Sequence, residues 1–119
     1  MATPNIVNVA TINGFTTTAT AGVTTAVLLN CPTDKIYKIN SVICTNISSS
    51  NQAVYLSYDD TTASTEKYLA FNNTVPTNGS LVVIGKDFPI YLEETDNLKL
   101  FASANNSIDV TVSFESLED

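Results

Sequence analysis

Histidine, arginine and tryptophan are all absent from this chain of 119 residues. Without histidine, the chain lacks the usual general base, most zinc sites and every Ser–His or Cys–His nucleophile pair. Five lysines stand against twelve acidic residues, and the formal net charge is −7. Because phosphate recognition is built from clustered Lys and Arg, this balance argues against a nucleic-acid partner.

Long apolar runs are also missing, since none approaches the ~20 residues that span a bilayer. The first five residues carry no positive charge, and no apolar core follows them, so nothing resembles a secretory signal. Cys31 and Cys44 could form one bridge. Without a signal we expect both to be reduced and buried as small hydrophobic residues. The expected product is soluble, made inside a cell and not bound to a membrane.

The composition that remains favours strands. Apolar residues make up 44% of the chain and charged residues only 14%, while the rest is mostly Thr, Asn and Ser. These polar residues are typical of strands and turns rather than helices. The length suits one domain with a sizeable core, which needs neither metal nor disulfide to fold. We therefore predict an all-β protein.

The clearest pattern lies near the C-terminus, where two runs alternate strictly between apolar and polar residues. The apolar positions are Leu98, Leu100, Ala102 and Ala104 in the first run and Ile108, Val110, Val112 and Phe114 in the second. This period of two is typical of half-buried antiparallel strands, and residues 105–107 favour a turn. The two runs predict a terminal β-hairpin.

Upstream, further strands are predicted over residues 6–12, 24–31, 35–47, 53–58 and 68–71. Asn13-Gly14 predicts a type I′ turn that closes a first hairpin, and Asn72-Asn73 is expected to end the strand at 68–71. In the 35–47 segment, simple alternation places Tyr37, Ile39, Ser41, Ile43, Thr45 and Ile47 on one face. A tight turn is expected at 75–79, with Gly79 at positive φ.

About eight strands joined by Gly, Pro and Asn turns indicate a two-sheet antiparallel β-sandwich that is jelly-roll-like. Residues 1–5, which include Pro4, are expected to form an N-terminal arm, and residues 6–119 a single β-sandwich domain.

Two acidic segments are the candidates for chemistry. Asp59-Asp60 and Glu93-Glu94-Thr95-Asp96 could supply paired carboxylates for glycoside hydrolysis or oxygen ligands for calcium. Both segments fall in predicted polar turns, and neither matches a known calcium loop, so solvated turn charges are the favoured interpretation. We predict no enzyme, no catalytic or metal-ligating residue and no cofactor.

Interface residues are expected among the tyrosines, because tyrosine combines apolar area with a polar tip. Tyr55 alternates with Val54 and Leu56 and should face outward. The predicted interface residues are Ile6, Val7, Tyr55, Tyr58 and Tyr91.

Several segments resemble the C-terminal half of small virion proteins of tailed bacteriophages, cyanophages among them. The similar segments are Val75-Pro76-Thr77-Asn78-Gly79-Ser80-Leu81, Phe88-Pro89-Ile90-Tyr91-Leu92, Leu98-Lys99-Leu100-Phe101-Ala102 and 107–114. Residues 31–39 are similar to a segment that leads into a strand in the same group, although Asp34 stands where Gly is usual. The acidic turn at 92–98 is one residue longer than in that group, and Ile108 replaces its first Val.

This resemblance implies a non-enzymatic virion structural protein, and foremost a capsid decoration or cement protein that docks as a symmetric oligomer, with a trimer favoured. Its partners would be the major capsid protein or neck and tail proteins, and its location the virion. An alternative is a neck, tail or fibre component with a carbohydrate-binding or host-adhesion role, with loops 48–52, 59–65 and 93–97 as the binding rim.

Overall fold

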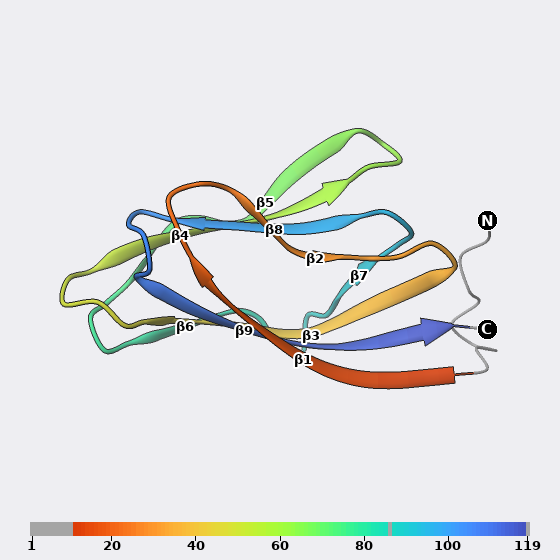
Figure 1. Cartoon of the computed structure of the whole chain (residues 1–119), viewed down its shortest axis with the longest axis horizontal. Helices are drawn as coiled ribbons and strands as arrows, with labels where there is room; N and C mark the ends of the chain where they lie inside the picture. Colours follow the sequence, from red (N-terminus) through yellow and green to blue (C-terminus); the bar gives the residue numbers. More distant parts are fainter. Residues whose placement is uncertain (1–10, 86, 119) are drawn as a thin grey trace.

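The computed structural model describes residues 11–85 and 87–118, and within these ranges the chain forms strands and no helix (Figure 1). No helix in this part of the chain is therefore long and apolar enough to cross a membrane. The strands are β1 (Thr11–Ala21), β2 (Ala26–Asn30), β3 (Lys35–Asn46), β4 (Gln52–Asp60), β5 (Thr65–Val75), β6 (Ser80–Ile84), β7 (Ile90–Leu92), β8 (Asn97–Ala102) and β9 (Ile108–Glu118).

The strands form two antiparallel sheets, which lie as two layers in Figure 1. One sheet has the order β1-β9-β3-β6, with β7 also paired to β3, and the other has the order β2-β8-β4-β5. When β6 and β7 are counted as one interrupted strand, each sheet contains four strands and early strands lie beside late ones. This is the order of a jelly roll built from two Greek keys, so the predicted fold class is confirmed.

The core lies between the two sheets and is built from side chains that alternate inward. On the first sheet they include Ile39, Val42, Cys44, Ile108, Val110 and Val112; on the second they include Val54, Leu56, Leu98 and Leu100. Each fully buried Val, Leu or Ile contributes about 1.5–3 kcal/mol relative to an exposed one. Cys31 and Cys44 are both fully buried with free thiols, in agreement with the sequence interpretation.

The predicted terminal hairpin is wrong, although both of its strands exist. β8 pairs with β2 and β4 in one sheet, whereas β9 pairs with β1 and β3 in the other. The apolar faces of β8 and β9 therefore face each other across the core instead of lying side by side. Alternation reveals which face of a strand is buried, but it does not reveal which strand is its neighbour.

The predicted hairpin at Asn13-Gly14 is also wrong. β1 runs through both residues without a bulge, with Asn13 opposite Ser116 and Gly14 opposite Glu115 of β9. No glycine in the described part of the chain has positive φ. The long ladder with β9 thus overrides the local turn preference of the Asn-Gly pair. Residues 1–10 lie outside the described residues, and so does the proposed boundary between arm and domain at residue 5.

Bulges account for two further differences. The register of β3 against β9 shifts between Ile39 and Ser41, so the core-facing positions change from Tyr37 and Ile39 to Val42 and Cys44. Ile43 is consequently 36% exposed on the outer face. A strict alternation over 35–47 therefore predicts the wrong face for the second half of this strand, because one inserted residue reverses the inside–outside pattern.

In β5, the predicted stop at Asn72-Asn73 is a bulge within a longer strand, with Asn72 at φ 53°. Asn78 and Asp34 are two of the turn residues that also adopt positive φ. Asn78, not Gly79, has φ 62° in the turn before β6. Asp34 has φ 66° before β3, at the position where the resembled proteins carry Gly. Asn and Asp are the non-glycine residues that best tolerate this conformation.

Candidate functional site

An aromatic patch covers part of the outer face of the β2-β8-β4-β5 sheet. It consists of Tyr55 from β4, Tyr68 and Phe71 from β5, and Phe101 from β8. Tyr55 and Phe101 are directly opposite in the ladder, and their rings stack with centroids 4.3 Å apart and planes within 5°. Phe71 meets Tyr55 edge-on at 5.2 Å, and Tyr68 meets Phe71 at 4.9 Å.

The patch is ordered yet accessible. Phe71 is 63% exposed and Tyr68 is 48% exposed, whereas Tyr55 and Phe101 are half-buried. The bulge at Asn72 supports the arrangement, because the Tyr55 hydroxyl donates a hydrogen bond to Asn72 Oδ1 at 3.0 Å. Four packed aromatic rings on one sheet face form a preorganised apolar surface of the kind that protein interfaces use.

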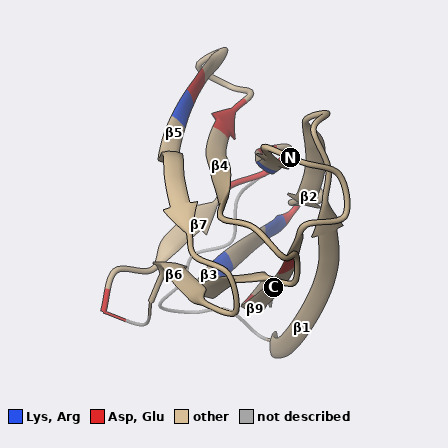
Figure 2. Cartoon of the chain, turned by 90° about the vertical axis from the view of Figure 1, so that its left-hand side faces the viewer, with Lys and Arg blue, Asp and Glu red and all other residues tan. Residues whose placement is uncertain are grey.

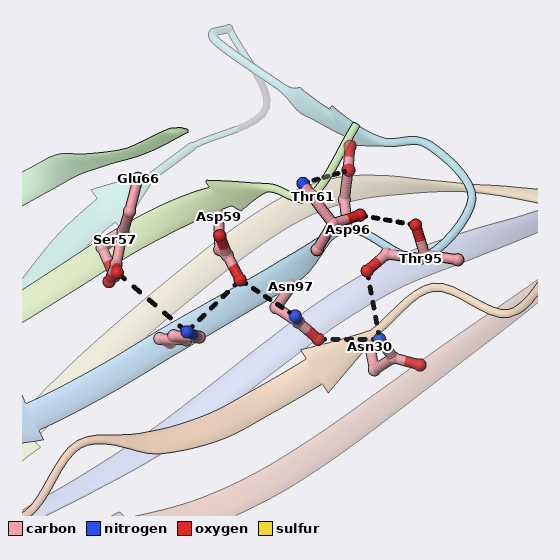
Figure 3. A network of polar contacts seen from close by, with 9 residues as sticks. Asn30, Ser57, Asp59, Thr61, Glu66, Thr95, Asp96 and Asn97 are labelled. Carbon is pink, nitrogen blue, oxygen red and sulfur yellow. Dashed lines mark hydrogen bonds and ion pairs between the residues drawn. The ribbon is translucent and has the colours of Figure 1, made fainter. Parts of the chain in front are cut away.

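A network of polar side chains lies on the same sheet beside the patch (Figure 3). Lys99 Nζ lies 3.3 Å from Asp59 Oδ2 and 4.0 Å from Glu66 Oε1. Asn97 Nδ2 donates to Asp59 Oδ2 at 3.1 Å. The hydrogen bond from Asn97 and the nearby Lys99 lower the pKa of Asp59, so this carboxylate stays ionised and is unsuited to donate a proton as a general acid.

Asp96 is the central residue of the acidic turn and is only 1% exposed. Its Oδ1 accepts from the Thr61 backbone N–H at 3.2 Å, and its Oδ2 accepts from the Tyr58 hydroxyl at 2.7 Å and from the Glu93 N–H at 3.2 Å. These bonds join the β7–β8 turn to the β4–β5 hairpin. Asp96 is thus a satisfied structural carboxylate.

In the described part of the chain, the acidic segments do not gather into a metal-binding cluster. Among the residues that the structure describes, no group of three or more Cys, Asp and Glu side chains could hold a metal ion. Asp59 and Asp96 are both committed to hydrogen bonds within the fold. The sequence interpretation of these segments as solvated turn charges is therefore correct for neither of these two residues, because both are tied to neighbouring strands.

The three loops predicted as a binding rim do not form one rim. Thr61 and Thr95 are joined through their hydroxyls, so loops 59–65 and 93–97 are neighbours. Loop 48–52 lies at the other end of β4, where Asn46 Nδ2 donates to the Ser50 carbonyl (Figure 1). A strand of the length of β4 separates the two ends by about 30 Å.

Of the five predicted interface residues, the three that the structure describes, Tyr55, Tyr58 and Tyr91, do not share one surface. Tyr55 faces outward within the aromatic patch, as its alternation predicts. Tyr58 packs against the core and donates to Asp96, and burial together with this hydrogen bond raises its pKa. Tyr91 is 42% exposed on β7, in the other sheet. Ile6 and Val7 lie outside the described residues, and an interface role for all five stays a prediction.

Tyr68, Phe71 and Phe101 are the members of the patch that the predicted interface set does not contain. The alternation of residues 98–104 already places Phe101 on the face opposite to Leu98 and Leu100, which is a usable signal. Phe71 carries no such signal, because bulges interrupt the register between β4 and β5.

A hollow lies on the other sheet, between β1 and β9, with a volume of about 490 Å³. It is lined by Thr18, Ala19, Thr20, Asp109, Val110 and Thr111. Asp109 is its only ionisable group and accepts from the Thr20 hydroxyl at 3.1 Å. With one exposed carboxylate among threonines, the hollow offers no cluster of ionisable groups, so it is a weaker candidate than the aromatic patch.

Among the described strands, charged residues lie on β3, β4, β5, β8 and β9 (Figure 2). In the first sheet, Lys35 Nζ lies 3.7 Å from Glu118 Oε2, and Lys38 Nζ lies 4.0 Å from Glu115 Oε1. The ribbon of β1 carries no charged residue. Lys35 and Lys38 in this sheet and Lys99 in the other thus balance part of the acidic net charge.

Comparison with known proteins adds information on the fold. No protein family matches the chain, and no curated protein matches it. Among solved structures, a chain of Bacillus endospore appendages, described as disulfide-linked pili, is 13% identical with a TM-score of 0.53. That alignment covers 92% of this chain and 88% of the other. A chain of infectious bursal disease virus, Gt strain, is 12% identical with a TM-score of 0.44, over 92% of this chain and 31% of that one. The likeness to the appendage chain shows a shared sandwich fold.

Proposed function

We propose that the protein is a non-enzymatic structural subunit of a tailed-phage virion, in the role of a capsid decoration or cement protein that docks as a symmetric homo-oligomer. The observation that carries the proposal is the exposed aromatic patch on an ordered sheet face. The resemblance of residues 31–39 and 75–114 to small phage virion proteins supplies the virion context. The partners would be other virion proteins, and the host cytoplasm would be the place of synthesis.

A docking role suits the physical character of the patch. Phe71 and Tyr68 keep about half or more of their side chains in water, although a single aromatic side chain has a large apolar area to bury. Covering a side chain such as Phe71 with a partner would contribute about 1.5–3 kcal/mol. Because the rings are already packed against one another, little side-chain entropy is lost on docking.

A non-enzymatic role is supported by the side chains available. The sequence has no histidine, and two of its best-placed carboxylates, Asp59 and Asp96, are held by hydrogen bonds within the fold. The pKa of Cys44 is raised to about 11 by burial, and Cys44 is fully buried, so this thiol is no nucleophile. The exposed aromatic patch remains as a surface for contact.

The test is to add the purified protein to virions produced without it and to measure cosedimentation. We expect the wild type to bind and Phe71→Ser to bind at least about tenfold more weakly, because the variant removes the most exposed ring of the patch. Val82→Ser is the matched control: Val82 is 58% exposed on β6, in the other sheet, and its loss should leave binding unchanged.

Two outcomes would contradict the proposal. One is a wild-type protein that does not bind the particle, and the other is equal binding by the two serine variants. If the protein instead binds glycans on an array, and Phe71→Ser abolishes that binding, the patch would be a sugar-stacking surface and the neck, tail or fibre role would replace decoration.

A further inference from the structure

Four strand edges bound the two sheets, and three of them are protected against pairing. At one edge of the first sheet, the short strands β6 and β7 are separated by a segment that contains Pro89. In the second sheet, β2 has five residues and a bulge between Val27 and Leu29. The opposite edge strand β5 carries Glu66 and Lys67 and is bulged twice. Short length, proline, charge and bulges are the usual means of blocking edge-to-edge association.

The fourth edge, β1, has none of these protections. It extends over 11 residues, and its register with β9 has no shift from Thr11 to Ala21. Its sequence, TINGFTTTATA, contains neither a charge nor a proline. Within residues 11–85 and 87–118, no strand pairs with its outer side. An extended strand of this kind presents a row of backbone donors and acceptors that require an extended partner.

Exposed apolar side chains accompany this free edge. Ile12 is 57% exposed and Phe15 is 50% exposed. Phe15 stacks on Phe114 with ring centroids 5.5 Å apart. A strand placed beside β1 would cover the open side of this ring, because residues on adjacent strands share a sheet face.

From these features we infer that β1 pairs antiparallel with β1 of a second copy of this chain, about a two-fold axis at Thr16. Thr16 is the middle residue of β1, so this register places Thr16 opposite itself, Phe15 opposite Thr17 and Ile12 opposite Thr20 of the second copy. The two sheets would join into one continuous sheet. The inference deepens the proposed function, on which it rests, by naming the contact between copies in the oligomer.

Charge is compatible with a second copy as the partner despite the net charge of −7. No like charges meet across the junction, because β1 is uncharged. One strand further in, Glu115 and Glu118 of β9 are already paired with Lys38 and Lys35. Asp109 lies beside Thr20, at one end of β1, so the two-fold axis places its symmetry copy at the opposite end.

The contact also determines the symmetry. A strand that pairs with its own copy in antiparallel orientation forms an isologous interface, which closes as a dimer. The trimer favoured from the sequence would need a different contact. A pairing of this length would add on the order of ten backbone hydrogen bonds.

The experiment measures the self-association of the full chain by analytical ultracentrifugation, using Thr16→Lys and Thr16→Glu. Thr16 is exposed, so either substitution leaves the core intact. Each variant alone places like charges opposite each other, and we expect its dimer to be at least about tenfold weaker than that of the wild type. An equimolar mixture of the two should recover a one-to-one dimer, because opposite charges then face each other.

Thr74→Lys is the matched control, since Thr74 is an exposed threonine on the edge strand β5 and the substitution changes the net charge by the same amount. Its dimer should be as strong as that of the wild type. The inference is overturned by a wild type that stays monomeric up to about 1 mM, by equal effects of the two lysine variants, or by a mixture that does not re-associate. Particle binding by a monomeric wild type would remove this contact and leave the virion role standing.

Discussion

The Asp96 carboxylate offers the sharpest test of how the polar network supports the fold. Substituting Asp96→Asn keeps the volume of the side chain but removes its charge and one of its two acceptor oxygens. In the native protein these oxygens accept from the Tyr58 hydroxyl at 2.7 Å and from the backbone N–H groups of Thr61 and Glu93, each at 3.2 Å. The amide cannot satisfy both backbone donors at once.

The magnitude follows from these contacts. A hydrogen bond to a charged group contributes about 1.5–3 kcal/mol, and a buried donor left without a partner costs about 1–3 kcal/mol. The Tyr58 hydroxyl can rotate and accept from the new amide, so part of the loss is recovered. We therefore expect Asp96→Asn to lower the free energy of unfolding by about 2–4 kcal/mol, out of the 5–15 kcal/mol typical of a domain.

The assay is urea unfolding followed by circular dichroism. Asp109→Asn is the control for the same chemical change, because Asp109 is exposed and accepts one hydrogen bond, from the Thr20 hydroxyl. The control should stay within about 0.5 kcal/mol of the wild type. The reasoning would be refuted if Asp96→Asn cost less than about 1 kcal/mol, or no more than the control.

Two further predictions concern stability. A Cβ on Gly79 would come within 2.8 Å of Pro76 Cγ and 3.0 Å of Pro76 O, whereas a Cβ on Gly14 would have no described atom within 4 Å. In thermal or urea unfolding, Gly79→Ala should therefore lower the free energy of unfolding by about 1–3 kcal/mol, and Gly14→Ala should raise it by about 0.5–1 kcal/mol. Equal effects of the two substitutions would contradict this prediction. Burial raises the pKa of the Cys31 and Cys44 thiols from the ordinary 9.0 to about 11. Because the thiols ionise at lower pH in the unfolded chain, their contribution to stability is fully present below pH 9 and is lost as the pH rises to about 11. Between pH 9 and 11, the urea midpoint of Cys44→Ala should therefore fall less steeply than that of the wild type. Parallel pH profiles of the two proteins would speak against this prediction.

The aromatic patch illustrates how far sequence reasoning reaches into the candidate site. The alternation of Tyr55 with Val54 and Leu56 is enough to turn its ring outward, and the same pattern turns Phe101 outward on β8. That these two rings stack, and that Phe71 joins them, depends on the pairing of β4 with both β5 and β8. Phe71 is placed by bulges in the β4–β5 register, which do not follow from its neighbours in the chain.

The sequence alone determined that the protein is all-β, which residues of β8 and β9 face the core, and that both cysteines are buried. These properties follow from the two-residue repeat of a strand and from composition, both of which are local. Only the tertiary structure decided that β8 and β9 belong to different sheets, that Asn13-Gly14 continues a strand, and that Asp59 and Asp96 are structural. Strand partners, bulges and buried hydrogen bonds join residues far apart in the chain, and their energies depend on the whole packed sandwich.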